Sequence, residues 1–314
     1  MTAIAPDSSA TLVPSQIPSD IAAELRAMGR GIEPAKTSAL YRGLHAHPSY
    51  DGVAVERDVP YGPAPLQRLD VLRPAVRGPD LSGGFSGPPD LERARPVLLY
   101  VHGGAFVGGD KTPPGSFCFD NVMLWAVRHG LVGVNINYRL APQYRWPAGA
   151  EDLGLAVSWV QTTIAGFGGD PERIVVVGHS AGAVHAADYI GNPRTHGARG
   201  HGLAGAALLS GIYDLSHGMA SPAYYGEDPA RYAACSSLPG LVSTPLPLLL
   251  VHAELDPAPF IAQTEQLAAA LAAAGRPPTL LALAGHSHIS EVMAVNTDDT
   301  SLTAPLAGFL EALW

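Results

Sequence analysis

Hydrophobic positions along this chain fall into short runs that are apolar throughout and longer segments with helical spacing. Continuous apolar runs are typical of strands buried on both faces of a parallel sheet. The predicted strands are Val53–Val59, Leu66–Leu72, Val97–Val101, Leu131–Ile136, Ile174–Val177, Ala206–Leu209, Leu246–Val251 and Leu280–Leu283. Predicted helices separate the later strands, namely Phe117–Arg128, Gly149–Thr163, Ala181–Ile190, Phe260–Ala274 and Leu306–Leu313. This order predicts an α/β fold with a mostly parallel, eight-stranded sheet and helices on both faces.

The N-terminal part of the chain has a different pattern. Residues 1–20 are rich in Pro, Ser and Ala, which predicts a flexible segment. Apolar positions at helical spacing begin at Ile21 and continue toward His45, with breaks expected at Gly31 and Pro34. We therefore expect one α/β domain over residues 21–314, in which residues 21–50 contribute a small cap. The Gly- and Pro-rich stretch Gly78–Pro96 is expected to be a loop.

Composition limits the classes of partner. The chain has 314 residues, of which 47% are hydrophobic and 15% charged, as in a globular domain. A formal net charge of -9 argues against nucleic acid as a partner. The 12 histidines are scattered, without an H-E-x-x-H pair or a Cys/His cluster at metal-ligand spacing. We expect no metal and no other cofactor.

The cysteines and the N-terminus indicate the compartment. Cys118 and Cys235 are the two cysteines, too few for a disulfide scaffold, so free thiols are expected although the sequence leaves their pairing open. The first residues lack the basic and apolar regions of a secretory signal. No run approaches the roughly 18 apolar residues that cross a bilayer. These features predict a cytoplasmic protein without a membrane partner.

A candidate nucleophile lies where a predicted strand meets a predicted helix. The segment Gly178-His179-Ser180-Ala181-Gly182 follows the run that ends at Val177 and has the G-x-S-x-G pattern of a nucleophile elbow. The glycines allow the sharp turn that lifts the serine hydroxyl above the sheet edge. The pattern alone is weak in a chain with 35 glycines, and a Gly-rich turn without catalytic meaning is the alternative. Its place between strand and helix favours the elbow.

A second Gly-rich segment follows an earlier strand. Val101 is followed by His102-Gly103-Gly104-Ala105-Phe106, whose backbone can direct several N–H groups at one point. Acyl transfer needs such donors, because the carbonyl oxygen becomes an anion in the tetrahedral state. We assign the N–H groups of Gly103, Gly104 and Ala181 to this oxyanion hole. Phosphate binding is the alternative, but neither G-K-[ST] nor G-x-G-x-x-G spacing is present.

A serine nucleophile needs a base and an acid, and the sequence offers two candidates for each. Glu254 and Asp256 follow the strand that ends at Val251, and His286 and His288 follow the strand that ends at Leu283. The order Ser, acid, His is the one expected in this type of fold. We favour Asp256 because it lies further beyond the strand end, where its side chain can reach over the sheet.

These motifs together resemble the bacterial hormone-sensitive-lipase-like carboxylesterases, and the related arylformamidase-like hydrolases, of the α/β-hydrolase fold. The resemblance covers nearly the whole chain from Ile21. Its segments are Tyr61-Gly62 through Leu69-Asp70-Val71, His102 through Phe106, Asn137-Tyr138-Arg139-Leu140-Ala141-Pro142-Gln143, and Gly168-Gly169-Asp170-Pro171 followed by Gly178 through Gly182. The chain departs from the family pattern at Ala105, at His179 and at Ile289-Ser290, and the last departure leans toward the formamidase-like branch.

The resemblance implies a serine carboxylesterase with Ser180 as nucleophile, Asp256 as acid and His288 as base. In the family, the base follows a glycine and two variable residues, as His288 follows Gly285. The family often dimerises through its last strand, here near Leu280–Leu283. A small-molecule ester is the expected substrate. An amidase of the arylformamidase type and a binding protein that has lost catalysis are the alternative functions.

The substrate pocket is less legible from the sequence. The expected lining residues are Phe106, Val107, Tyr138, His179, Tyr213, Tyr224, Tyr225 and Ile289. For each aromatic residue, an ordinary core or surface position is the alternative. The segment between Ser210 and Leu246 is short and leaves room only for a small lid. We therefore expect short acyl chains.

Overall fold

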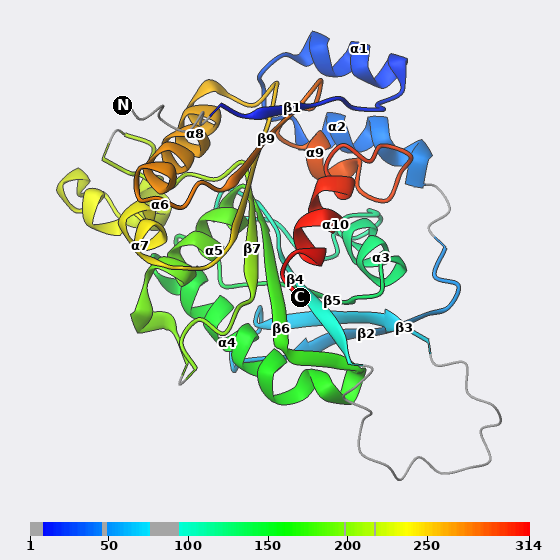
Figure 1. Cartoon of the computed structure of the whole chain (residues 1–314), viewed down its shortest axis with the longest axis horizontal. Helices are drawn as coiled ribbons and strands as arrows, with labels where there is room; N and C mark the ends of the chain where they lie inside the picture. The colour runs from blue at the N-terminus through cyan, green and yellow to red at the C-terminus, as the bar shows by residue number, and fades with distance from the viewer. Residues whose placement is uncertain (1–8, 46–48, 76–93, 198, 217) are drawn as a thin grey trace, which may run out of the picture.

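One sheet organises the whole molecule (Figure 1). The computed structural model describes residues 9–45, 49–75, 94–197, 199–216 and 218–314. The strands are β1 Thr11–Val13, β2 Val53–Pro60, β3 Arg68–Pro74, β4 Arg95–Val101, β5 Val132–Ile136, β6 Gly169–His179, β7 Gly205–Leu209, β8 Leu248–Ala253 and β9 Thr279–Leu283. The helices are α1 Ser19–Met28, α2 Pro34–Tyr41, α3 Asp120–Arg128, α4 Ala148–Thr163, α5 Ala181–Gly191, α6 Pro222–Tyr225, α7 Leu238–Ser243, α8 Ala258–Ala273, α9 Ser290–Met293 and α10 Thr303–Glu311.

The sheet is mostly parallel, as its apolar strands predict. Its order is β1-β9-β8-β7-β6-β4-β5-β3-β2. Only the β5–β3 and β3–β2 pairs are antiparallel. All eight predicted strands are present as β2 to β9, so the α/β-hydrolase type of sheet is confirmed. The predicted number of strands is wrong, because the sheet has nine.

The additional strand comes from the segment that was expected to be flexible. In β1, Thr11, Leu12 and Val13 pair in parallel with Leu281, Ala282 and Leu283 of β9. Residues 1–8 lie outside the described residues, but from residue 11 the expectation of flexibility does not hold. A strand of three residues, followed directly by Pro14, is too short to leave an apolar pattern, and the backbone edge of β9 supplies the partner that orders it.

The same pairing bears on the expected dimer contact. A second copy could extend the sheet only along a strand whose outer backbone groups are free. Leu281–Leu283 already pair with β1 of the same chain. Along Leu281–Leu283, the edge of the predicted contact is therefore occupied by β1 of the same chain.

Two apolar layers cover the sheet. On one face, α4, α5 and α8 bury Leu153, Ala183 and Leu267 against strand residues such as Leu99. On the other face, α3 and α10 bury Met123 and Leu306 (Figure 1). Strands with helices on both faces must be apolar on both sides, which explains their continuous runs. No helix in the described ranges combines the length and apolar character that crossing a bilayer requires.

The segment predicted as a helical cap is two helices joined by a turn. α1 and α2 are separated at Gly29, which has φ 64°, and α2 begins at Pro34. A short 3-10 turn, Arg42–His45, follows. Ile21, Leu25 and Tyr41 pack against Met293 of α9, at the top of Figure 1. Most of the predicted loop Gly78–Pro96 lies outside the described residues, and β4 begins within its last residues at Arg95.

Both cysteines are free, as expected. Cys118 packs beside α1 and α9, whereas Cys235 packs in a cluster with Ala181. Both thiols are buried, and burial raises the pKa of each. Neither has the lowered pKa of a reactive cysteine.

Leu99→Ala tests how much the central strand contributes to stability. Leu99 is fully buried in β4, so its truncation leaves a cavity between the sheet and its helices. We expect a loss of about 2–5 kcal/mol in the free energy of unfolding, measured by urea denaturation. Leu12→Ala is the control, since Leu12 is 62% exposed on β1, and it should change stability by about 0.5 kcal/mol or less. Equal effects of the two variants would contradict this account.

Candidate active site

The polar side chains singled out by the sequence meet at one edge of the sheet. The loop with Gly103 follows β4, and Ser180 directly follows β6. Asp256 follows β8 and His288 follows β9, so all four loops leave the carboxyl ends of neighbouring parallel strands. This is the edge at which ligands bind in open α/β sheets.

Ser180 lies in a strained turn between β6 and α5. Its φ is 55° and its ψ is -120°, a backbone conformation that residues other than glycine rarely adopt. The turn packs tightly, because a Cβ placed on Gly182 would lie 2.0 Å from the carbonyl oxygen of Val101. Ser180 N–H donates to the carbonyl of Leu209 in β7 at 2.9 Å. The turn therefore holds the serine at the N-terminus of α5.

Three side chains form a continuous hydrogen-bonded row. His288 Nδ1 lies 2.7 Å from Asp256 Oδ1, and His288 Nε2 lies 2.8 Å from Ser180 Oγ. An ionised carboxylate only accepts, so Nδ1 carries the imidazole proton and Nε2 is the acceptor for the serine hydroxyl. The imidazole and the carboxylate are buried, whereas Ser180 is partly exposed. The arrangement can therefore take a proton from a hydroxyl that a substrate can reach.

Hydrogen bonds keep the Asp256 carboxyl ionised. Burial by itself raises the pKa of Asp256, but hydrogen bonds from His288, Ser210 and the backbone of Ala253 outweigh it and hold this pKa below its ordinary value. Ser210 Oγ donates to Asp256 Oδ2 at 2.6 Å, and Ala253 N–H donates to the same oxygen at 2.9 Å. Arg30, from the turn after α1, donates to the backbone carbonyl of Asp256 at 2.5 Å. The N-terminal helices therefore also brace this loop.

The structure separates the alternatives for acid and base. Glu254 turns away from the row, and its Oε2 accepts the N–H of Gly285 at 2.7 Å. His286 is fully buried, and its Nε2 lies 3.0 Å from Asp299 Oδ2. Its Nδ1 faces Ser290 Oγ at 3.1 Å, so both ring nitrogens are in use within the fold. Asp256 and His288 are therefore the members of each pair that lie in the row with Ser180.

The loop after β4 lies directly beside the serine. A Cβ placed on Gly103 would lie 3.0 Å from the Cβ of Ser180. Among the described residues, the N–H groups of Gly103, Gly104 and Ala181 have no acceptor within the chain. These donors are therefore available to an anionic oxygen placed beside Ser180.

A buried asparagine supports the base of that loop. Asn137 Oδ1 accepts the N–H of Lys111 at 2.6 Å and lies 3.1 Å from His102 Nε2. Asn137 Nδ2 donates to Asp110 Oδ2 at 3.0 Å. Since these bonds join both ends of the loop to the residue after β5, the glycine backbone between them is held in place.

The expected pocket residues divide into two groups. Phe106, Tyr224 and Tyr225 pack in one apolar cluster with Ala181, next to the nucleophile. Val107 is 49% exposed and Ile289 is partly buried, both in the loops around the site. His179, Tyr213 and Tyr138 are almost fully buried, and Tyr224 of the apolar cluster is buried to the same degree. These four side chains have almost no exposed surface in this structure.

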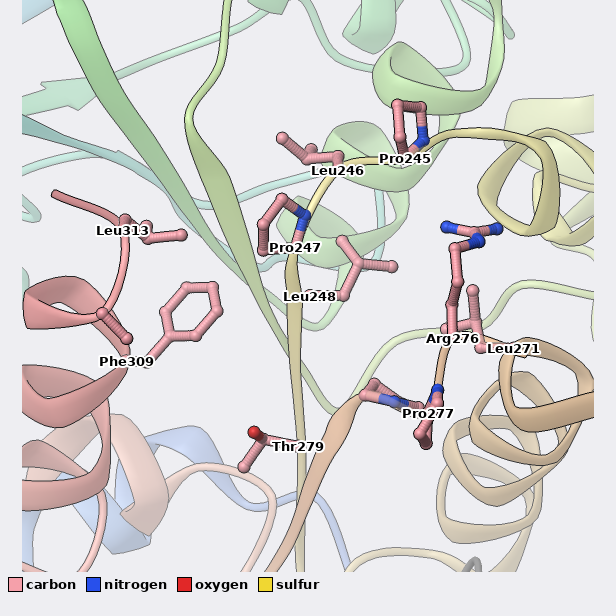
Figure 2. Close-up of a pocket in the computed structure, with 12 residues that line it drawn as sticks. Pro245, Leu246, Pro247, Leu248, Leu271, Arg276, Pro277, Thr279, Phe309 and Leu313 are labelled. Carbon is pink, nitrogen blue, oxygen red and sulfur yellow. The ribbon is translucent and has the colours of Figure 1, made fainter. Parts of the chain in front are cut away.

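The cavity drawn in Figure 2 lies away from the row. Its volume is about 350 Å³, and its lining includes Pro245, Leu248, Arg276, Thr279 and Leu313. Leu248 and Thr279 begin β8 and β9, so the cavity lies at the amino ends of strands whose carboxyl ends lead to the row. The guanidinium of Arg276 bonds to the backbone carbonyls of Val242 and Thr244, which supports the loop before β8.

Several contributors to the site were not found from the sequence. Ser210 directly follows β7, and the rule that polar residues at strand ends gather at one edge was sufficient to find it. Phe260 packs on the His288 imidazole with ring centroids 4.6 Å apart. Arg30 acts through a contact with Asp256, which is 226 residues away in the chain, and no local pattern marks such a contact.

Comparisons of the sequence show relatives among hydrolases. The model of a family described as having the α/β-hydrolase fold matches residues 98–291. Esterase LipQ of Mycobacterium tuberculosis is 30% identical over 308 residues, which cover 91% of this chain and 69% of LipQ. Carboxylesterase NlhH of the same species is 35% identical over 147 residues, which cover 42% of each protein.

Comparison of the structure agrees on the fold. A crystal structure of esterase B from Lactobacillus Rhamnosis has a TM-score of 0.69 with this chain. The alignment covers 94% of this chain and 95% of that protein at 18% identity. At this identity the likeness concerns the fold, and it extends over nearly the whole chain.

Asp299→Asn tests how the His286–Asp299 pair contributes to stability. Burial raises the pKa of Asp299, but bonds from His286 and Ser301 outweigh it and lower this pKa from 3.8 to about 2. A carboxyl whose pKa is lower in the folded state stabilises the fold above the unfolded value. That contribution, on the order of 2 kcal/mol, is lost as pH falls from about 4 to about 2.

Asp299→Asn should therefore have a lower free energy of unfolding at neutral pH than wild type, measured by urea denaturation. Between about pH 4 and pH 2, its free energy of unfolding should fall less steeply than that of wild type. Asp298→Asn is the matched control, because its side chain is exposed, and it should keep the wild-type curve. An unchanged acid dependence in Asp299→Asn would contradict the assigned role.

Proposed function

The chain belongs to the α/β-hydrolase fold family and is a carboxylic ester hydrolase of the hormone-sensitive-lipase-like type, and from that premise we propose that Ser180, His288 and Asp256 hydrolyse small, short-acyl esters. The unbroken row of hydrogen bonds from Asp256 through His288 to Ser180 carries the proposal. The serine is the partly exposed end of that row.

In the proposed first stage, Ser180 Oγ attacks the ester carbonyl carbon while its proton passes to His288 Nε2. The Asp256 carboxylate stabilises the imidazolium that forms. The carbonyl oxygen becomes an anion and accepts hydrogen bonds from the N–H groups of Gly103, Gly104 and Ala181. When the tetrahedral state collapses, the bond to the alcohol oxygen breaks, and His288 returns its proton to that oxygen. Ser180 is left as an acyl ester.

In the second stage, water takes the place of the alcohol. His288 accepts a proton from the water, whose oxygen attacks the acyl carbon. The oxyanion again lies against the same three N–H groups. Collapse releases the carboxylic acid and returns the proton to Ser180 Oγ, so the enzyme is regenerated without another reactant.

The proposal agrees with the electrostatics of the row. Asp256 stays ionised because three donors point at its carboxyl group. The oxyanion donors are backbone groups in a loop braced by Asn137, so they need no reorganisation during the reaction. Removal of one such donor typically costs about 10²–10³ in kcat.

The surroundings of Ser180 favour a small acyl group. Phe106 and Tyr224 stack in parallel with centroids 4.5 Å apart, and Tyr225 packs against Phe106 edge to face. These rings fill the space beside Ala181. In the described part of the segment between β7 and β8, the α-helices are both short: α6, which carries Tyr224 and Tyr225, and α7.

Ser180→Ala tests the nucleophile. Hydrolysis of p-nitrophenyl acetate by the purified variant should fall by about 10⁶, to the level left by binding and the oxyanion hole. A fluorophosphonate probe should label the wild-type protein at Ser180 and not label the variant. Turnover that survives in pure Ser180→Ala would refute the assignment.

Glu254→Ala is the matched control for the acid. Asp256→Asn should lower kcat by about 10³–10⁴, because the imidazole loses its fixed tautomer. Glu254 only supports the Gly285 backbone, so Glu254→Ala should retain activity within about tenfold. Equal losses in the two variants would mean that the acid is assigned wrongly.

A panel of substrates tests the size and class of the acyl group. We expect kcat/KM for p-nitrophenyl esters to be highest for acetate and butyrate and to fall by at least about 10-fold at laurate, because the aromatic cluster blocks a long chain. N-formylkynurenine belongs in the panel, since an arylformamidase would use the same row of side chains. A preference for long-chain esters, or for the formamide, would contradict the proposal.

A further inference from the structure

Lysine occurs at two positions in the chain, and the two side chains have opposite environments. The Lys36 side chain, in α2, is 68% exposed, and its Nζ lies 3.4 Å from Glu33 Oε2. The Lys111 side chain is only 5% exposed, although a buried ammonium group is costly unless it is paired. Lys111 ends the Gly-rich segment after β4 that contains Gly103 and Gly104. The surroundings of Lys111 therefore bear on the candidate oxyanion hole.

Each polar group of Lys111 has a partner. Its N–H donates to Asn137 Oδ1 at 2.6 Å, and its carbonyl oxygen accepts from Asn135 Nδ2 at 2.6 Å. Its Nζ lies 2.8 Å from Asp70 Oδ1 and 2.8 Å from Asp58 Oδ1. These partners belong to β2, β3, β5 and the residue after β5, so neighbouring strands fix this one residue of the loop from several sides.

The ion pairs of Lys111 belong to a row of alternating charge. Asp70 is fully buried in β3, and its Oδ2 accepts from Arg57 Nη1 at 2.8 Å. Arg57 Nη1 also donates to Asp120 Oδ1, at the start of α3, at 2.8 Å. Burial raises the pKa of Asp70, but bonds from Lys111, the Asp58 N–H and Arg57 outweigh it and hold this pKa below its ordinary value. Lys111 therefore faces an ionised carboxylate that has a second cation on its other side.

Close packing transmits the position of Lys111 to the peptide units of the oxyanion hole. Gly109 lies against Gly103, since a Cβ placed on Gly109 would lie 2.4 Å from the carbonyl oxygen of Gly103. Gly108 N–H donates to the carbonyl oxygen of Gly104 at 3.0 Å. A peptide unit is planar, so the direction of the Gly103 carbonyl also fixes the direction of the Gly104 N–H. The residues just before Lys111 therefore determine where a donor of the hole points.

We propose that Lys111 is a positioning residue, whose ion pairs with Asp70 and Asp58 keep the N–H donors of the glycine loop directed at the oxyanion. The inference rests on the proposed esterase function. Lys111 is not a catalytic residue, because its polar groups are all bonded within the fold, and it acts through Gly108 and Gly109. An ion pair that only stabilises the fold is the alternative, and it predicts different kinetics.

Lys111→Met tests the proposal in the purified full chain. The kcat for p-nitrophenyl acetate should fall by about 10- to 100-fold, less than the loss of a whole oxyanion donor costs, and KM should change by about twofold or less. Lys111→Arg, which can still pair with both carboxylates, should recover most of the lost kcat. Lys36→Met is the matched control, because it removes the exposed lysine by the same substitution, and it should keep the wild-type kcat and KM.

Phenylboronic acid supplies a measurement that partial unfolding does not change. Ser180 Oγ forms a bond to its boron and passes its proton to His288, and one boronate oxygen then lies in the oxyanion hole as in the transition state. The inhibition constant of Lys111→Met should therefore rise by about the factor by which kcat falls. If Lys111 only stabilised the fold, fewer active sites would take a fluorophosphonate label, and the sites that remain would keep the wild-type inhibition constant.

Two results would overturn the proposal. One is wild-type kcat in Lys111→Met, and the other is a lower kcat with an unchanged inhibition constant. Asp70 keeps its bonds from Arg57 and the Asp58 N–H, so we expect Lys111→Met to fold. If urea denaturation shows that it does not, Lys111→Gln replaces it, because the shorter amide side chain cannot reach both carboxylates. The same two results in Lys111→Gln would overturn the proposal, and a parallel change of kcat and inhibition constant would support it.

The two proposals fail in different ways. Wild-type protein that hydrolyses no ester and takes no fluorophosphonate label would refute the proposed function. An active wild-type enzyme whose Lys111→Met variant has the same kcat and the same inhibition constant would refute only the role of Lys111.

Discussion

Parallel pairing of β4, β6, β7, β8 and β9 is the constraint on which the rest of the structure depends. Each connection between parallel strands must cross back to the amino-terminal edge of the sheet. The loops that follow these strands therefore all lie at the carboxyl-terminal edge. Loops that are more than 100 residues apart in the chain thereby meet within hydrogen-bond distance, as Ser180 and His288 do. Helices on both faces exclude water from this sheet and keep it rigid. The loops are rigid where they leave the strand ends.

Of the buried groups Asp256 and His179 at this edge of the sheet, only Asp256 is charged. Asp256 is kept ionised by donors from two other loops and from the end of β8, whereas burial keeps His179 neutral. The low dielectric of the interior makes a lone charge useful to an imidazolium and makes a second carboxylate costly.

The two outer edges of the sheet end in different types of strand. The antiparallel β2–β3 hairpin ends one side, and β1 closes the other by pairing with β9. β1 is short, and its Leu12 is exposed, yet it occupies the backbone groups of the strand whose loop carries His288. The N-terminal segment thus belongs to the support of the site: β1 borders β9, and Arg30 holds the Asp256 backbone.

The sequence alone determined the class of the sheet, because buried parallel strands must be apolar on both faces and leave a pattern that needs no tertiary information. It also placed Ser180 and the two candidates each for acid and base at strand ends, since local motifs mark these positions. Only the tertiary structure decided between Glu254 and Asp256 and between His286 and His288, because both members of each pair lie in the same loop and differ in where the side chain points. The places of β1 and Arg30 were likewise decided by contacts with distant segments, for which a linear sequence carries no periodic signal.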